Sequence, residues 1–187
     1  MKSVLFVTTN EGKVSEVRKI LKKLHIKVRR VELREEKHLT HPQLVRLKAL
    51  HAFEVLRKPV VVEDTCLFID GFKDYPGLRS KEVFNKIGLK GFVSKCGGRK
   101  AFFRTIAAYC DGRRVFLFTG VCKGRISKTI AGQSIVGLPF LRIFIPLGFD
   151  KPVAAFSKKD LKKFLFEENH RAKAFKKLEK WILANRG

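Results

Sequence analysis

The chain opens with a pattern of apolar and polar positions that predicts a strand followed by a helix. Residues 4–7 form a short apolar run that ends in the polar residues 8–10, which is typical of a buried parallel strand. Apolar residues then recur at helical spacing, at Val14, Val17, Leu21 and Leu24. This spacing predicts an amphipathic helix from about residue 12 to residue 24.

A second strand, a second helix and a strongly apolar third strand are expected next. Residues 26–33 alternate apolar and basic side chains, as a half-exposed strand does. A helix is expected to begin near Pro42, because proline is favoured at the first helical position. Its buried face is marked by Val45, Ala49, Ala52 and Leu56. The run 60–62 predicts a buried strand that ends at the polar residues 63–65, after which 66–69 continue apolar.

The second half of the chain predicts a hairpin between two helices. Residues 80–88 have helical spacing, and two apolar runs, 102–109 and 115–121, flank Asp111-Gly112. Asp-Gly between apolar runs is a strong hairpin signal. A short strand is expected at 143–146, and a terminal amphipathic helix is marked by Ala174, Phe175, Leu178, Trp181 and Ile182.

This order of elements favours an α/β fold with an antiparallel middle. The 187 residues suit one domain, and we expect a single domain over residues 1–187. Hydrophobic residues make up 45% of the chain, but no apolar run approaches the roughly 20 residues of a membrane span. The opening residues carry no recognisable signal peptide, so we expect a soluble protein of the cytoplasm.

The four cysteines predict buried free thiols in a reducing compartment. No two of them form a Cys-x-x-Cys pair, and Cys66, Cys110 and Cys122 lie in apolar, strand-like sequence. A zinc site would need histidines, and His38-x-x-His41 is the only close pair. We interpret that pair as a loop before a proline.

The chain is strongly basic. Lys and Arg number 41 against 17 Asp and Glu, which gives a formal net charge of +24. The excess is spread over the chain rather than held in a tail, and it suits polyanionic ligands, either nucleotides or nucleic acid. A lysine-rich solvated surface would give the same composition.

The loop 8–13 is a candidate phosphate site. A strand end that leads into a helix N-terminus offers unpaired backbone N–H groups and the positive end of the helix dipole. Gly12 allows close backbone approach, Lys13 adds a charge, and Thr8 and Asn10 add polar contacts. Many strand-to-helix turns contain Asn, Gly and Lys for capping alone, so the loop by itself leaves both readings open.

Glu63 and Asp64 are adjacent carboxylates beside an all-valine run. Burying them without partners would be costly, so they must face a metal, a basic partner or water. Adjacent residues of a strand point to opposite faces, which predicts different roles for the two. Mg²⁺ binding with water activation and a structural ion pair with lysines are both consistent with the pattern.

Asn169-His170-Arg171 stands where the last helix is expected to begin. A His and an Arg beside the N-terminal amides of a helix suit an anion or the edge of a base. A capping Asn followed by two surface charges is the alternative.

Five segments in this order resemble the inosine/xanthosine triphosphate pyrophosphatase family. Residues 8–13 match its opening Ser/Thr-x-Asn-x-x-Lys, and 62–67 match its acidic pair followed by Ser/Thr at a strand end. Pro76-Gly77 matches a Pro-Gly that opens a helix, and 118–126 match a hairpin ending in Gly-x-Ile/Val. Residues 169–174 are close to Ser-His-Arg-x-x-Ala on the last helix. The likeness runs nearly end to end.

The resemblance implies a fold and a reaction. The fold would have two lobes around a long mixed sheet with flanking helices, an active cleft between the lobes, and a homodimeric assembly. The reaction would hydrolyse deaminated purine nucleoside triphosphates (ITP, dITP, XTP) to the monophosphate and pyrophosphate. Water would attack the α-phosphorus, with Mg²⁺ as the metal and Mn²⁺ as its alternative.

The same resemblance implies roles for individual residues. Asp64 would be the general base that orients water, and Glu35, Glu63 and Asp64 would hold the metal. Thr8, Asn10 and Lys13 would hold the phosphates. The base and sugar would be contacted by Thr65, Phe140, His170 and Arg171.

The chain departs from the family at the base end of the site. The family carries Phe-Gly-Tyr/Trp-Asp-Pro before the late strand, and here Leu141 stands at the Asp and Arg142 at the Pro, with Phe140 able to supply an aromatic face. A Lys five residues before the His is replaced by Leu165, and the Ser before that His is Asn169. Losing an Asp and a Lys removes polar groups that discriminate between bases, so we expect weak or altered base selectivity. The alternative is a degenerate member that binds nucleotide or nucleic acid without hydrolysis.

Overall fold

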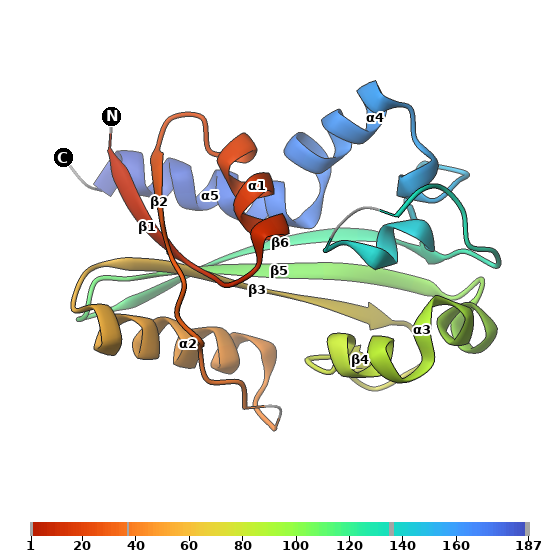
Figure 1. The fold of residues 1–187 in the computed structure, drawn as a ribbon, viewed down its shortest axis with the longest axis horizontal. Helices are drawn as coiled ribbons and strands as arrows, with labels where there is room; N and C mark the ends of the chain where they lie inside the picture. The colour runs from red at the N-terminus through yellow and green to blue at the C-terminus, as the bar shows by residue number, and fades with distance from the viewer. Residues whose placement is uncertain (1, 37, 135–136, 186–187) are drawn as a thin grey trace.

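The computed structural model describes residues 2–36, 38–134 and 137–185, which form helices around a long mixed sheet (Figure 1). The strands are β1 (Ser3–Val7), β2 (His25–Arg29), β3 (Val60–Ile69), β4 (Pro76–Gly77), β5 (Lys100–Cys110), β6 (Val115–Ile126) and β7 (Phe144–Pro146). The α-helices are α1 (Glu11–Ile20), α2 (His41–Leu56), α3 (Ser80–Cys96), α4 (Lys158–Lys163) and α5 (His170–Asn185). Short helical turns lie at η1 (Pro139–Arg142), η2 (Val153–Ala155) and η3 (Phe164–Glu168). The α/β fold class expected from the sequence is confirmed.

Within the described residues the sheet has seven strands in the order β2-β1-β3-β5-β6-β7, with β4 paired to β3. The β2-β1-β3 part is parallel, and every other pairing is antiparallel. The β5–β6 hairpin turns at Asp111, whose carboxylate accepts the backbone N–H groups of Arg113 and Arg114 at 2.8 and 2.7 Å. The hairpin predicted from Asp111-Gly112 is therefore confirmed.

One edge of β3 is open in its middle. β1 pairs with β3 at Phe6 and Val61, and β4 pairs with it at Leu67 and Phe68. Between these points the described residues provide no strand beside residues 62–66 on that side, while β5 pairs along the full length of β3 on the other. Side chains from both faces of β3 can therefore reach the same gap.

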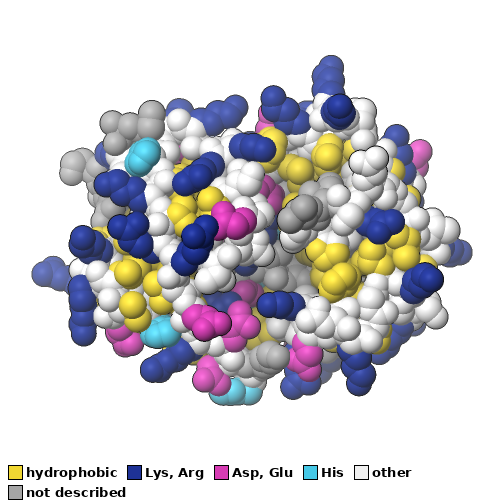
Figure 2. Space-filling view, viewed as in Figure 1, with side chains coloured by type: hydrophobic (Ala, Val, Ile, Leu, Met, Phe, Trp, Pro, Cys, Tyr) yellow, Lys and Arg dark blue, Asp and Glu magenta, His cyan; other side chains and the backbone are white. Residues whose placement is uncertain are grey.

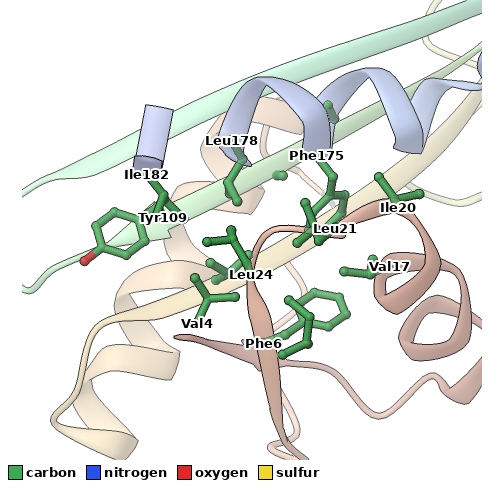
Figure 3. Packing of buried hydrophobic residues seen from close by; sticks show 14 of the residues in the cluster. Val4, Phe6, Val17, Ile20, Leu21, Leu24, Tyr109, Phe175, Leu178 and Ile182 are labelled. Atoms are coloured by element: carbon green, nitrogen blue, oxygen red, sulfur yellow. The ribbon is translucent and has the colours of Figure 1, made fainter. Parts of the chain in front are cut away.

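Helices cover both faces of the sheet and each covers its own part of the core. α1 and α5 lie on one face and α2 and α3 on the other (Figure 1). On the first face Phe6 packs edge-on against Phe175, with ring centroids 5.7 Å apart, and α1 contributes Val17 to the same cluster (Figure 3). α2 covers Val60 and Val62 of β3 with Val45 and its neighbours. A third cluster at the far end joins α3, η1 and β7 to β5.

The strand at residues 60–62 does not end at Glu63-Asp64-Thr65, and here the sequence-based expectation was wrong. β3 continues to Ile69, because every residue from Val60 onward pairs with β5. Polar side chains can lie within this strand because charged partners from three helices reach them. The polar run therefore marks the gap in the sheet edge and not a strand end.

Other boundaries also differ from the expectations. The first helix spans residues 11–20, where 12–24 was expected, and the third spans 80–96 in place of 80–88. Gly88 interrupts α3 with φ 59° and ψ −173°, so the helix bends at the glycine and resumes. Pro76-Gly77 forms the short strand β4, and the helix begins only at Ser80.

The cysteine prediction is confirmed, since all four thiols are free and buried. His38 is exposed beside Glu36 and His41 is buried at the start of α2, so the two do not form a site together. None of the described helices combines the length and the apolar character needed to cross a bilayer.

Candidate active site

A cavity of about 280 Å³ lies at the gap in the β3 edge, between the α1–α5 side and the α3–η1 side. It brings together eight of the ten residues expected from the sequence: Asn10, Lys13, Glu35, Asp64, Thr65, Phe140, His170 and Arg171. The other two, Thr8 and Glu63, do not line it but contact residues that do. The residues expected from five separate segments thus meet in one place.

The loop between β1 and α1 is built as a helix N-terminus. The Asn10 side chain caps α1 by accepting the backbone N–H of Lys13 at 3.0 Å. Thr8 Oγ1 accepts the backbone N–H of Asn10 at 3.2 Å, which holds the loop in shape. The cap explains why Asn stands here, and it leaves the Lys13 side chain directed toward the carboxylate of Glu63.

Asp64 is held at both carboxylate oxygens by side chains of α2. Lys48 Nζ lies 2.8 Å from Oδ1, His41 Nε2 lies 3.2 Å from Oδ2, and the Cys66 thiol also reaches Oδ2 at 3.4 Å. Burial alone would raise the pKa of Asp64, but the contact with His41 and the charges of Lys48 and Lys13 hold that pKa well below its usual range. Asp64 is therefore a carboxylate throughout the neutral pH range.

Glu35 and Asp64 share one cation. Lys48 Nζ lies 3.0 Å from Glu35 and 2.8 Å from Asp64. Burial opposes the charge on Lys48, but the two carboxylates outweigh it and raise the pKa of Lys48. Glu35 and Asp64 both line the cavity, and the positive charge of Lys48 lies between their carboxylates. A divalent cation would supply positive charge to the same two carboxylates. Carboxylate oxygens are the ligands that Mg²⁺ and Mn²⁺ prefer. Glu35 and Asp64 therefore fit a metal of this kind.

Glu63 has different partners from Glu35 and Asp64. Its carboxylate is fully buried on the opposite face of β3, where it pairs with Lys13 and with Arg171 Nε at 3.3 Å and accepts the Thr65 hydroxyl at 3.0 Å. Burial raises its pKa, but Lys13 and Arg171 lower that pKa more strongly, to about 2. Its oxygens face Lys13 and Arg171, the two cations that approach the cavity, and the metal role expected for Glu63 stays a prediction. The prediction that Glu63 and Asp64 have different roles agrees with this alternation.

A buried network fixes Arg171 at the start of α5. Arg171 Nη1 pairs with Glu16 of α1, and both side chains are almost fully buried. Asn169 Nδ2 donates to the other Glu16 oxygen at 2.7 Å, while Asn169 Oδ1 accepts the backbone N–H of Ala172 at 2.8 Å. Asn169 therefore caps α5 and ties it to α1, which explains how Asn serves in place of the Ser expected there.

His170 is neutral and fixed. Its Nδ1 lies 2.6 Å from the Thr105 hydroxyl, which in turn lies 2.6 Å from that of Thr65. Its ring stacks on Phe103 with centroids 5.0 Å apart. Burial, reinforced by the charge of Arg171, lowers the pKa of His170 well below its ordinary value. Neutral His170 contributes shape and one hydrogen-bonding edge and carries no charge.

The far end of the cavity is apolar and aromatic. Phe140 packs edge-on against Phe92 and Phe84, with centroid distances of 5.0 and 5.5 Å. Leu141 lines the cavity beside Phe140, whereas Arg142 is turned away and donates to the carbonyl of Gly132 at 3.1 Å. Leu165 packs into the neighbouring apolar cluster. Polar side chains on this side come from α3, through Ser80 and Lys81.

Three site residues were missed by reading the sequence: Lys48, His41 and Glu16. Lys48 falls on the apolar stripe of α2, at helical spacing from Val45 and Ala52. Glu16 stands on the buried face of α1 next to Val17. A charged residue on an otherwise apolar helix face is the signal that could have identified both, since such a residue needs a buried partner. His41 carried no comparable signal.

His41, Asp64 and Cys66 also group closely enough for a metal, with their ligand atoms within 4.8 Å of one another. Their protonation speaks against that use. Arg104 Nε donates to His41 Nδ1 at 3.1 Å, so the ring proton of neutral His41 is on Nε2, the nitrogen that faces Asp64. Burial, with Asp64 nearby, raises the pKa of the Cys66 thiol far above its usual range. The group is held by the hydrogen bond from Cys66 to Asp64 and by the close contact of His41 Nε2 with the same carboxylate, and its protonation does not fit a metal centre.

The fold and the cavity define an α/β protein with a polar cleft in which a capped helix N-terminus and lysines face a pair of carboxylates. Residues 4–181 match the model of the Ham1 family, and the chain belongs to that family.

Relatives of similar length are known in archaea. The chain is 35% identical to the dITP/XTP pyrophosphatase of Methanopyrus kandleri over 97% of each chain. It is 31% identical to the enzyme of the same name from Saccharolobus solfataricus, over 94% of this chain and 91% of that one. Among solved structures, a HAM1 protein from Coxiella burnetii superposes with a TM-score of 0.78 at 22% identity, over 98% of this chain and all of that one. The Ham1 protein of Staphylococcus aureus gives 0.74 at 21% identity, over 99% of this chain and all of that one. These structures support the fold.

Proposed function

We propose that this protein hydrolyses deaminated purine nucleoside triphosphates, dITP, ITP and XTP, to the monophosphate and pyrophosphate. One observation carries the proposal: the carboxylates of Glu35 and Asp64, which share a contact with Lys48, line the same cavity as Asn10 at the α1 N-terminus and Lys13. A triphosphate needs cations and N–H donors along its length, and water attack on phosphorus needs a fixed carboxylate beside it. The names of the archaeal relatives support the same substrate class.

The phosphates would lie along the α1 N-terminus. Asn10 and Lys13 face the cavity, and Thr8 keeps the loop in the shape that exposes them. Lys13 is paired with Glu63, and Arg171 approaches the same carboxylate. Glu63 therefore holds both cations in place, so that Lys13 can donate to phosphate oxygens and Arg171 to the sugar or base.

Asp64 would orient the attacking water. Its pKa is held well below the neutral range, so it accepts a hydrogen bond from water but retains a proton poorly. The proton would pass on to solvent. Glu35 and Asp64 are the residues that would hold Mg²⁺, or Mn²⁺ in its place, and such an ion neutralises the charge that develops on the phosphoryl oxygens. Lys48 lies between the same two carboxylates and would turn toward the phosphates when they bind.

The base would enter the aromatic end of the cavity. Phe140 offers a ring, and His170 and Thr65 offer hydrogen-bonding atoms near the sugar. Because Leu141 replaces the acidic residue of the family pattern, discrimination between bases rests mainly on an apolar wall. An apolar pocket of this kind discriminates between similar substrates by about 100-fold or less in kcat/KM. We therefore propose weak selectivity among purine triphosphates.

A nucleotide or nucleic-acid binder without hydrolysis is the second candidate, and the net charge of +24 favours it. Lys and Arg side chains are scattered over the visible face and do not form one stripe (Figure 2). Nucleic-acid affinity that falls steeply with log[salt], together with no turnover of any nucleotide, would support this candidate.

We also propose that residues 1–187 act as one domain, that the protein is a homodimer, and that it works in the cytoplasm. The resemblance to the family supports the dimer, and the exposed apolar side chains of Leu50 and Val55 on α2 offer surface for an interface. Light scattering at micromolar concentration tests the dimer, and a single species of 21.4 kDa would contradict it.

A pyrophosphate-release assay tests the proposed reaction. The wild type is presented with dITP, ITP, XTP, GTP, ATP and dUTP in Mg²⁺, beside the Asp64→Asn variant. We expect release from dITP, ITP and XTP, smaller but measurable release from GTP, and none in the variant. Asp150→Asn is the matched control, since Asp150 is exposed and does not line the cavity. Equal turnover in wild type and Asp64→Asn would contradict the role of Asp64, and no turnover in a folded wild type would contradict the function.

A further inference from the structure

The proposed reaction leaves one buried polar residue of the site without a role. His41 begins α2 with a side chain only 1% exposed, and its Nε2 lies 3.2 Å from Oδ2 of Asp64. Nε2 makes no hydrogen bond to any other described residue, so Asp64 is the acceptor within its reach. A histidine costs more to bury than the apolar residues that usually occupy a helix face, so its contacts require a reason.

Arg104 determines which ring nitrogen of His41 carries the proton. Arg104 Nε donates to His41 Nδ1 at 3.1 Å, and an arginine cannot accept in return. Because Nδ1 accepts this hydrogen bond, the ring N–H of His41 is on Nε2, the nitrogen that faces Asp64. The Arg104 guanidinium is itself held over the ring of Phe68, 4.5 Å from its centroid, and Phe68 stacks on Phe102. The contacts thus connect the stacked rings of Phe68 and Phe102, through Arg104 and His41, to the carboxylate of Asp64.

The two oxygens of Asp64 have unequal surroundings. Oδ2 faces His41 and the Cys66 thiol, both buried behind it. Oδ1 contacts Lys48, which also contacts Glu35 at the cavity. His41 and Lys48 stand seven residues apart, which places them two turns apart on the same face of α2. Helix α2 therefore contacts both oxygens of Asp64, Oδ2 through His41 and Oδ1 through Lys48.

We propose that His41, fixed in the Nε2–H tautomer by Arg104, is a positioning residue that anchors Oδ2 of Asp64 and leaves Oδ1 as the oxygen that works on the substrate. This inference rests on the proposed function, because it assigns the geometry of the same carboxylate. Without the anchor, the Asp64 side chain can rotate about its terminal torsion and present either oxygen, so a smaller share of bound complexes is aligned for attack.

A purely structural role for His41 predicts a different result. If His41 only fills space at the start of α2, leucine would replace it with little effect on turnover. If its N–H anchors Asp64, glutamine should restore function, since the amide of Gln can place an N–H near the position of Nε2. The pair His41→Leu and His41→Gln therefore separates packing from positioning.

The test measures kcat and KM with dITP for wild type, His41→Leu, His41→Gln and Arg104→Met. The free energy of a hydrogen bond to a charged group corresponds to about 10- to 100-fold in a rate, if the bond is fully made in the aligned complex. We expect His41→Leu to lower kcat by that factor with KM within about twofold of wild type, because the nucleotide contacts other residues. His41→Gln should recover most of kcat, and Arg104→Met, which keeps the stem over Phe68, should show an intermediate loss. His38→Leu is the matched control, since His38 is 76% exposed on the segment before α2.

A second readout does not depend on activity. The ¹⁵N shifts of histidine side chains report which ring nitrogen carries the proton. We expect His41, assigned by its absence from the His41→Gln spectrum, to be in the Nε2–H form in wild type and to lose that preference in Arg104→Met. An Nδ1–H tautomer in wild type, or a kcat of His41→Leu equal to that of His41→Gln, would overturn the inference. The tautomer result does not depend on turnover, and the kcat comparison applies once wild type is active; failure of the proposed function is a different result, in which wild type itself releases no pyrophosphate.

Discussion

The buried pair between Glu16 and Arg171 offers a test of how the site is held together. Glu16→Gln removes one negative charge from a network in which both side chains are less than 5% exposed. Arg171 stays charged, because the carboxylates of Glu16 and Glu63 raise its pKa against the effect of burial. The substitution thus leaves a buried cation with less compensation, without creating a cavity.

The magnitude follows from the remaining contacts. Breaking a buried ion pair by removing one partner costs about 3–5 kcal/mol of unfolding free energy. Arg171 keeps Glu63 at 3.3 Å and the Thr65 hydroxyl at 3.1 Å, so the lower end, about 3 kcal/mol, is expected. For a domain of this size each kcal/mol shifts Tm by about 2–4 °C, which gives a fall of about 6–12 °C.

Thermal and urea unfolding measure this loss against a control on the same helix. Glu11 pairs with Arg30, but these side chains are 65% and 71% exposed. An exposed pair of this kind contributes about 1 kcal/mol or less, so Glu11→Gln should leave Tm nearly unchanged. If the Glu16→Gln and Glu11→Gln proteins unfold at the same temperature, the reasoning about the buried network is refuted.

Two further predictions concern pH and packing. The pKa of Glu63 is lowered from 4.5 to about 2 in the folded protein, so its contribution to stability is complete above pH 4.5 and is lost as the pH falls toward 2. Urea midpoints should therefore drop between about pH 4.5 and pH 2, and a flat profile over that range would contradict the ion pairs of Glu63. Gly120→Ala would place a Cβ 2.0 Å from the carbonyl oxygen of His170, so we expect α5 to be displaced, stability to fall by about 1–3 kcal/mol and dITP turnover to fall with it. Gly148→Ala is a control for an added methyl group, since a Cβ there has no neighbour within 4 Å; its φ of 86° adds backbone strain that Gly120 does not have, so this control overstates the effect of a methyl group alone. Similar turnover in both variants would contradict the close approach of α5 to β6.

Local sequence signals predicted the elements that depend on local chemistry. Asp111-Gly112 placed the hairpin, because the turn is specified by its own residues. The run 63–65 looked like a strand end, because the partners that allow polar side chains inside β3 come from α1, α2 and α5. Gly88 looked like the end of a helix, and packing beyond it extends α3 to Cys96.

The residues of the site also fall into two groups, those that local motifs could predict and those that depend on packing. The loop at Asn10 and the start of α5 at His170 could be placed from motifs, since capping fixes their geometry locally. Lys48 and Glu16 could not be placed, because their partners are distant in the chain and become neighbours only when the helices pack on the sheet. The partners of Glu63 could not be predicted for the same reason: its place next to Asp64 in the sequence does not reveal that Lys13 and Arg171 pair with its oxygens.

The central claim is that Asp64 directs water to the α-phosphorus of a bound triphosphate. Hydrolysis of dITP in H₂¹⁸O, followed by mass spectrometry of both products, tests it most directly. The account predicts one ¹⁸O in the nucleoside monophosphate and none in the pyrophosphate. Label in the pyrophosphate, or release of orthophosphate in its place, would contradict the account.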